Sequence, residues 1–157
     1  MEARAEKLSI QKLETGIKGF DKVAAGGLPK GRTTLVAGTA GSGKTVLAAQ
    51  LLAVGIEKYD QPGVFVTFEE SAEDIRRNIV SLGWDVPRWE EEGKWKFVDA
   101  SPLMDGETQV VGEYDLGALM ARMENAVNQI RARRLVVDSL GAVFSRFEDS
   151  TLVRAEL

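Results

Sequence analysis

The sequence predicts an α/β fold in which a parallel sheet carries helices on both faces. Four apolar runs of strand length alternate with segments whose apolar residues recur at three- and four-residue steps. This alternation is typical of strands joined by helical crossovers, which produce a parallel sheet. A glycine-rich loop joins the first apolar run to the first long helical segment, which is a third indication of the same fold.

The four expected strands are rich in β-branched or aromatic residues and are bounded by turn residues. They cover residues 33–37, 64–68, 94–98 and 135–137. The first helix is expected from Val46 onward, directly behind the glycine-rich loop. A second begins at Ser71, whose sequence Ser-Ala-Glu-Asp resembles a capping box with Asp in place of the usual Glu.

A third helix is expected from Asp115 onward. Its apolar stripe consists of Leu116, Leu119, Met120, Met123, Val127 and Ile130. That stripe predicts packing on the sheet, and binding of a partner helix is the alternative. Residues 83–93 contain Pro87 and an acidic run, Glu90-Glu91-Glu92. We expect that acidic run to be a solvated surface turn, and a functional role is the alternative.

Residues 38–45 read Gly-Thr-Ala-Gly-Ser-Gly-Lys-Thr, which is a complete phosphate-binding loop. Its glycines allow the tight turn that brings successive N–H groups together, and Lys44 supplies a positive charge for the β- and γ-phosphates. The Thr45 hydroxyl is expected to ligate Mg²⁺. The expected nucleotide contacts are therefore Gly38, Thr39, Ala40, Gly41, Ser42, Gly43, Lys44 and Thr45. These residues predict a bound ATP or GTP, and they do not distinguish the two bases.

Carboxylates end two of the expected strands. Asp138 follows the apolar run 135–137 and is expected to hold Mg²⁺ beside Thr45, usually through a water. The alternative is an ordinary strand-end aspartate. Glu69 and Glu70 follow the second strand, where one of them could orient the water that attacks the γ-phosphate. The alternative is that both are solvated acids at a helix entry, and spacing alone does not decide between these readings.

The composition excludes several kinds of chemistry. The 157 residues contain no cysteine and no histidine, so thiolate and imidazole catalysis or metal binding are ruled out. The net charge of −4 provides no overall electrostatic footprint for nucleic acid. No apolar run is long enough to span a bilayer, and the expected location is the cytoplasm.

Several motifs resemble a known family. Residues 15–21 (TGIKGFD) and 26–31 (GGLPKG) resemble the entry to the RecA-like superfamily. Residues 64–70 (VFVTFEE) and the sequence Asp99-Ala100-Ser101-Pro102 narrow the resemblance to the KaiC family, the ATPase of the cyanobacterial circadian clock and its relatives. The similarity runs from Leu13 to the last residue and matches the first of two tandem RecA-like domains.

This resemblance implies a RecA-like P-loop core, ATP as the nucleotide, and Glu69 and Glu70 as the catalytic carboxylates. It also implies a homohexameric ring with ATP between protomers. The loop that begins at Gly106 and ends at Asp115 (GETQVVGEYD) resembles the site where the partner KaiB docks, and an ordinary mobile surface loop is the alternative. Full-length members carry a second, autophosphorylating domain, so no kinase site is assigned to these residues.

We expect residues 1–157 to be a single RecA-like domain that ends before the family's remaining strands, as the N-terminal part of a longer chain. Such a piece alone should bind nucleotide weakly and hydrolyse it very slowly, because a charge donated by a neighbour contributes strongly to the rate. The expected function is slow ATP hydrolysis in a KaiC-like timing or signalling protein.

Two other functions are compatible with the sequence. The first is a RecA- or RadA-type recombinase or helicase, but the longest loop is acidic where DNA would require basic residues. The second is a non-catalytic module that senses bound nucleotide and signals to a partner.

Overall fold

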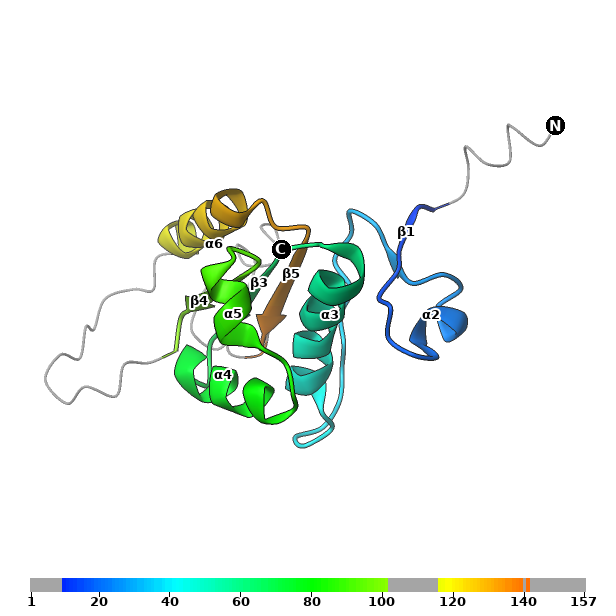
Figure 1. Ribbon diagram of the computed structural model, residues 1–157, viewed down its shortest axis with the longest axis horizontal. Helices are drawn as coiled ribbons and strands as arrows, with labels where there is room; N and C mark the ends of the chain where they lie inside the picture. The colour runs from blue at the N-terminus through cyan, green and yellow to red at the C-terminus, as the bar shows by residue number, and fades with distance from the viewer. Residues whose placement is uncertain (1–9, 102–115, 140, 142–157) are drawn as a thin grey trace, which may run out of the picture. The chain divides into compact units, whose positions relative to one another are not determined.

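The computed structural model describes residues 10–101, 116–139 and 141 (Figure 1). They divide between Lys44 and Thr45 into two compact units. The first unit contains β1 (Lys12–Leu13), α2 (Phe20–Val23) and β2 (Leu28–Pro29), with β1 antiparallel to β2. The expected docking loop, residues 106–115, and the residues from 142 onward lie outside the described part of the chain.

The second unit is built on a parallel three-stranded sheet of order β4-β3-β5. These strands are β3 (Gly63–Thr67), β4 (Trp95–Asp99) and β5 (Arg134–Asp138), each within one residue or so of its expected position. The register pairs Thr67 with both Asp99 and Asp138, so these three residues form the last rung at the carboxyl edge of the sheet. Paired residues of parallel strands point to the same face, so the three side chains share one face.

Helices cover both faces of this sheet, as the sequence predicts (Figure 1). One face packs Val64, Val66 and Val98 against α6 (Leu116–Ile130). The other face packs Phe65 and Trp95 against α3 (Lys44–Tyr59), α4 (Ala72–Ser81) and α5 (Val86–Glu91). The side chains of the last rung lie on this second face, where Asp138 contacts the start of α3 and Asp99 contacts the start of α4.

The expected strand at residues 33–37 is not formed. This segment is irregular, and Leu35 and Val36 are 71% and 49% exposed. A β-branched run becomes a strand only when a neighbouring strand accepts its hydrogen bonds. Among the described residues, the ladders join only β1 to β2 and β3 to its two neighbours. The prediction was therefore wrong because it relied on composition alone.

The expected solvated turn at residues 90–92 is only partly right, because Glu90 and Glu91 belong to helix α5 (Val86–Glu91), whereas Glu91 and Glu92 are exposed. Asp85 begins the helix by accepting a hydrogen bond from the Arg88 N–H, and Pro87 stands in the first turn, where no N–H is required. Glu90 is not simply solvated, since it forms an ion pair of 2.7 Å with Arg76 of α4. Trp89 of the same helix packs in the core.

A buried arginine ties α3 to the start of β5. Arg134 is 3% exposed, donates from Nε to Gln61 Oε1 at 2.8 Å and from Nη1 to the Leu51 carbonyl at 2.9 Å. Its guanidinium also lies 5.3 Å from the centre of the Tyr59 ring. Gly55 of α3 leaves room for this side chain, because a Cβ there would lie 2.6 Å from Arg134 Nε.

Gly55→Ala is therefore expected to destabilise the protein by about 1–3 kcal/mol, because the added methyl group displaces a well-packed side chain. Helix propensity alone predicts the opposite effect, an increase in the free energy of unfolding of up to about 1 kcal/mol, because alanine is the better helix former. Denaturant unfolding of the variant and of wild type measures whether the free energy of unfolding falls or rises. Glu57→Ala, on an exposed position of the same helix, is the matched control and should change stability by less than about 0.5 kcal/mol. If Gly55→Ala stabilises the protein, the Arg134 side chain must be able to move away from the new methyl group without losing stabilising contacts, which would contradict this prediction.

Candidate active site

The glycine-rich loop has the backbone that its sequence requires. Gly41 and Gly43 adopt left-handed conformations with φ of 76° and 83°, which side chains other than glycine rarely adopt. Gly38 is required for a different reason, since a Cβ there would lie 2.5 Å from Ser42 Oγ. Lys44 Nζ donates to the loop's own carbonyls, Gly38 O at 3.0 Å and Thr39 O at 2.9 Å. The ammonium group is thus held at the loop by two of the loop's own carbonyl oxygens.

The structure brings Thr45 and Asp138 together. Thr45 lies in the first turn of α3, and its Oγ1 donates to Asp138 Oδ2 at 2.6 Å, across 93 residues of sequence. Asp138 reaches this turn because it occupies the last rung of the sheet on the face that α3 covers. A hydroxyl oxygen and a carboxylate oxygen are hard ligands that suit Mg²⁺, so the pair fits the expected metal. Among the described residues, no cluster of three or more acidic side chains provides another such site.

Glu69 and Glu70 lie just past the end of β3 and are both exposed. Glu69 Oε1 accepts a hydrogen bond of 2.5 Å from the hydroxyl of Ser139, the residue after Asp138. Glu70 is held by its backbone instead, because its carbonyl accepts from Thr67 Oγ1 at 2.6 Å. The Glu69 carboxylate is therefore the one directed to the end of β5.

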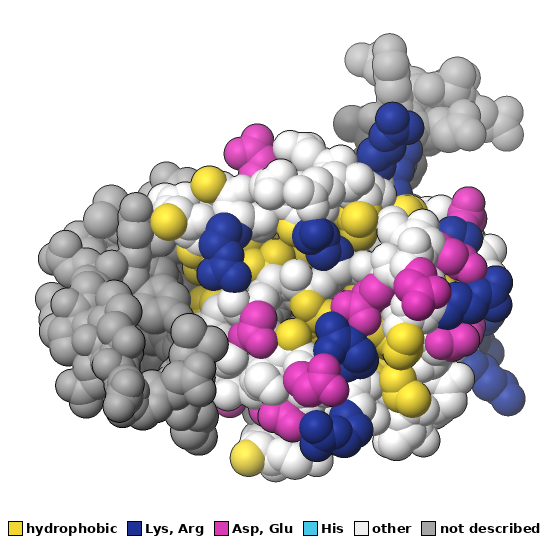
Figure 2. Space-filling model, turned by 60° about the vertical axis from the view of Figure 1, so that its left-hand side comes forward, with side chains coloured by type: hydrophobic (Ala, Val, Ile, Leu, Met, Phe, Trp, Pro, Cys, Tyr) yellow, Lys and Arg dark blue, Asp and Glu magenta, His cyan; other side chains and the backbone are white. Residues whose placement is uncertain are grey.

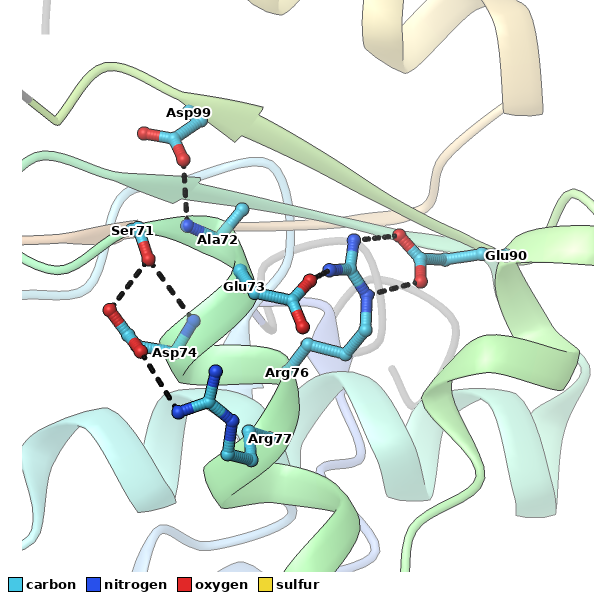
Figure 3. A network of polar contacts seen from close by, with 8 residues as sticks. All are labelled: Ser71, Ala72, Glu73, Asp74, Arg76, Arg77, Glu90 and Asp99. Atoms are coloured by element: carbon cyan, nitrogen blue, oxygen red, sulfur yellow. Dashed lines mark hydrogen bonds and ion pairs between the residues drawn. The ribbon is translucent and has the colours of Figure 1, made fainter. Parts of the chain in front are cut away.

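Two residues that the sequence did not single out as site residues also contribute here. Ser139 fixes the Glu69 carboxylate, and its position directly after Asp138 was the available signal. Asp99, in the last rung, accepts from the Ala72 N–H at the start of α4 at 2.7 Å (Figure 3). Burial of Asp99 opposes its ionisation, but hydrogen bonds from Ala72 and Ser101, together with the charge of Arg122, hold its pKa below the ordinary value.

Figure 2 shows a face on which basic and acidic side chains lie interspersed among uncharged ones, with no large area of one sign among the described residues. Several charged side chains of the described residues pair with one another, as Arg88 does with Glu92 at 2.7 Å. Among the described residues on this face, the charges form no continuous positive stripe of the kind that binds a nucleic-acid backbone. In the part of the chain that the structure describes, no helix is long and apolar enough to cross a membrane.

Comparison with known proteins identifies the family. Residues 13–157 match the family model described as "ATPase: KaiC". The circadian clock protein KaiC3 of Synechocystis sp. is 57% identical over 148 residues, which are 94% of this chain and 29% of that protein. The circadian clock oscillator protein KaiC of Synechococcus elongatus is 48% identical over 153 residues, which are 98% of this chain and 29% of that protein.

The chain thus spans less than a third of the length of these relatives. The matches confirm the sequence-based family assignment and the RecA-like α/β fold. They favour the KaiC family over the recombinase or helicase alternative. Membership in an ATPase family also implies that the chain binds a nucleotide, in agreement with the glycine-rich loop. The chain belongs to the KaiC ATPase family.

Proposed function

We propose that this chain is the ATP-binding and slowly ATP-hydrolysing domain of a KaiC-like timing or signalling protein. The observation that carries the proposal is the 2.6 Å contact between Thr45 and Asp138, which joins the last residue of the phosphate-binding motif to the end of a parallel strand. Nucleotide hydrolases of this class hold Mg²⁺ with that pair of side chains. The family match supports the same activity.

Each site residue has a distinct role in this proposal. The N–H groups of residues 38–43 and the Lys44 ammonium bind the phosphates. Thr45 and Asp138 hold Mg²⁺, which when bound neutralises negative charge on the phosphate oxygens. Glu69 accepts a hydrogen bond from the attacking water and orients it toward the γ-phosphate, and Glu70 assists from the same turn.

Assembly and partners form a finer part of the proposal. The relatives are clock proteins by name, and we propose that this chain, as part of a longer protein, acts in a homohexameric ring with ATP between protomers. A KaiB-like protein would dock on residues 106–115. Autophosphorylation would belong to a second domain of the full-length protein and not to these residues. Native mass with and without Mg-ATP tests the ring, because a sixfold mass is expected when nucleotide is bound.

Asp138→Asn tests the magnesium site. The variant is expected to weaken ATP binding about 10- to 100-fold in the presence of Mg²⁺, because the amide lacks the charge that holds the metal. In EDTA the wild-type protein and the variant should bind ATP equally. Isothermal titration of both proteins under both conditions measures the difference. Asp60→Asn, an exposed surface substitution, is the matched control. Equal weakening in EDTA would show that Asp138 acts on folding and not on the metal.

A further inference from the structure

The first turn of α4 is capped twice, by residues from different elements (Figure 3). Ser71 Oγ accepts from the Asp74 N–H at 3.1 Å, which is the ordinary N-cap bond. The Ala72 N–H, one of the donors that a helix leaves without an internal partner, donates instead to Asp99 Oδ2 at 2.7 Å. The two caps satisfy different donors, so neither replaces the other.

Asp99 is itself held at several points. Its place opposite Thr67 in the sheet fixes its backbone, and its carbonyl accepts from Arg122 Nη2 of α6 at 2.6 Å. Its second carboxylate oxygen, Oδ1, accepts from the Ser101 N–H at 2.9 Å and the Ser101 hydroxyl at 2.6 Å. A carboxylate held in this way is a fixed point to which the neighbouring helix is attached.

The chain between this fixed point and the candidate catalytic carboxylates is very short. Only Ser71 separates Ala72, which is bound to Asp99, from Glu70, whose carbonyl is bound to Thr67. Thr67 and Asp99 are neighbours on the same rung of the sheet. The turn that carries Glu69 and Glu70 is therefore pinned to one rung on either side of Ser71.

We propose that Asp99 is a positioning residue that, by holding the first turn of α4, keeps the Glu69–Glu70 turn in the geometry for water attack. This inference rests on the proposed hydrolytic function, because it assigns Asp99 no contact with nucleotide. Loss of the Asp99 carboxylate releases the Ala72 N–H and lets the turn move away from Ser139 and the end of β5. Small displacements of an aligned group reduce turnover strongly while leaving remote binding contacts intact.

The test compares wild-type protein with Asp99→Ala, Asp99→Asn and the control Glu90→Gln. Asp99→Ala is expected to reduce kcat at least about tenfold with ATP affinity unchanged within about twofold. Asp99→Asn keeps an oxygen that accepts from Ala72 and should recover kcat to within about threefold of wild type. Glu90→Gln, in α5, weakens the ion pair with Arg76, which lies in α4 beyond its first turn. This control should lower thermal stability without changing kcat.

Amide exchange and chemical shifts, followed by NMR, provide a readout independent of hydrolysis. In Asp99→Ala, the Ala72 amide should exchange at least about tenfold faster, and the amide shifts of Glu69 and Glu70 should change. The proposal is overturned if Asp99→Ala leaves these shifts and the exchange unchanged, or if its kcat falls no further than that of Glu90→Gln. A wild-type ring that binds ATP without hydrolysing it would refute the proposed function, and the exchange measurement would still decide whether Asp99 holds the turn.

Discussion

Lys44→Ala is expected to reduce ATP affinity by at least about 100-fold, because it removes a charged donor to the phosphates. In the structure the Lys44 ammonium is held at the loop by two carbonyl oxygens, Gly38 O and Thr39 O. It is therefore already at the phosphate-binding loop before nucleotide arrives, and little ordering of the side chain opposes binding. Titration with ATP in the presence of Mg²⁺ measures the loss.

The control for this experiment is Lys58→Ala, which removes the same charge from the last turn of the same helix. Its ATP affinity should remain within about threefold of wild type, since screening by salt weakens the effect of a distant exposed charge. Thermal stability of Lys44→Ala should also match wild type, because the Lys44 ammonium bonds to carbonyls of the loop itself, Gly38 O and Thr39 O. An affinity loss shared by both variants would indicate a general charge effect and contradict a specific role for Lys44.

The elements that the sequence predicted correctly have strong local signals. The α6 stripe of Leu119, Met123 and their neighbours has a helical period, and this face does pack on the sheet. The Ser71 cap is likewise a local signal and begins α4 as expected. The segment 33–37 has the composition of a strand, but strand formation depends on a partner elsewhere in the chain. A local pattern carries no information about that partner.

The same distinction separates the parts of the candidate site. Thr45 and Asp138 could be paired from sequence because each belongs to a motif whose chemistry requires the other. Asp99 could not be assigned to α4 in this way. The contact between Asp99 and Ala72 depends on the sheet register, which places Asp99 beside Thr67. The sequence around Asp99 does not predict that register. Likewise, the two glutamates became distinguishable only through the contact between Glu69 and Ser139.

Glu69→Gln is expected to reduce ATP hydrolysis about 10²- to 10⁴-fold, because the neutral amide is a weaker acceptor and does not polarise the attacking water as a carboxylate does. ATP affinity should be retained, since neither the loop nor the Thr45–Asp138 pair is altered. Glu70→Gln is the matched comparison and should have the smaller effect, because the anchored group of Glu70 is its carbonyl, which the substitution preserves. Single-turnover hydrolysis with ATP binding measured in parallel separates the two variants.

The two glutamine variants also distinguish an ATPase from a module that only senses bound nucleotide. In an ATPase, Glu69→Gln traps the ATP-bound state, so any nucleotide-dependent partner binding should persist in the variant long after wild type has hydrolysed its ATP. A larger loss in Glu70→Gln would reverse the roles that the Ser139 contact assigns. Wild-type turnover equal to that of both variants would contradict a catalytic role for either carboxylate. The chain would then signal to a partner through bound nucleotide at the Thr45–Asp138 site, and not through hydrolysis.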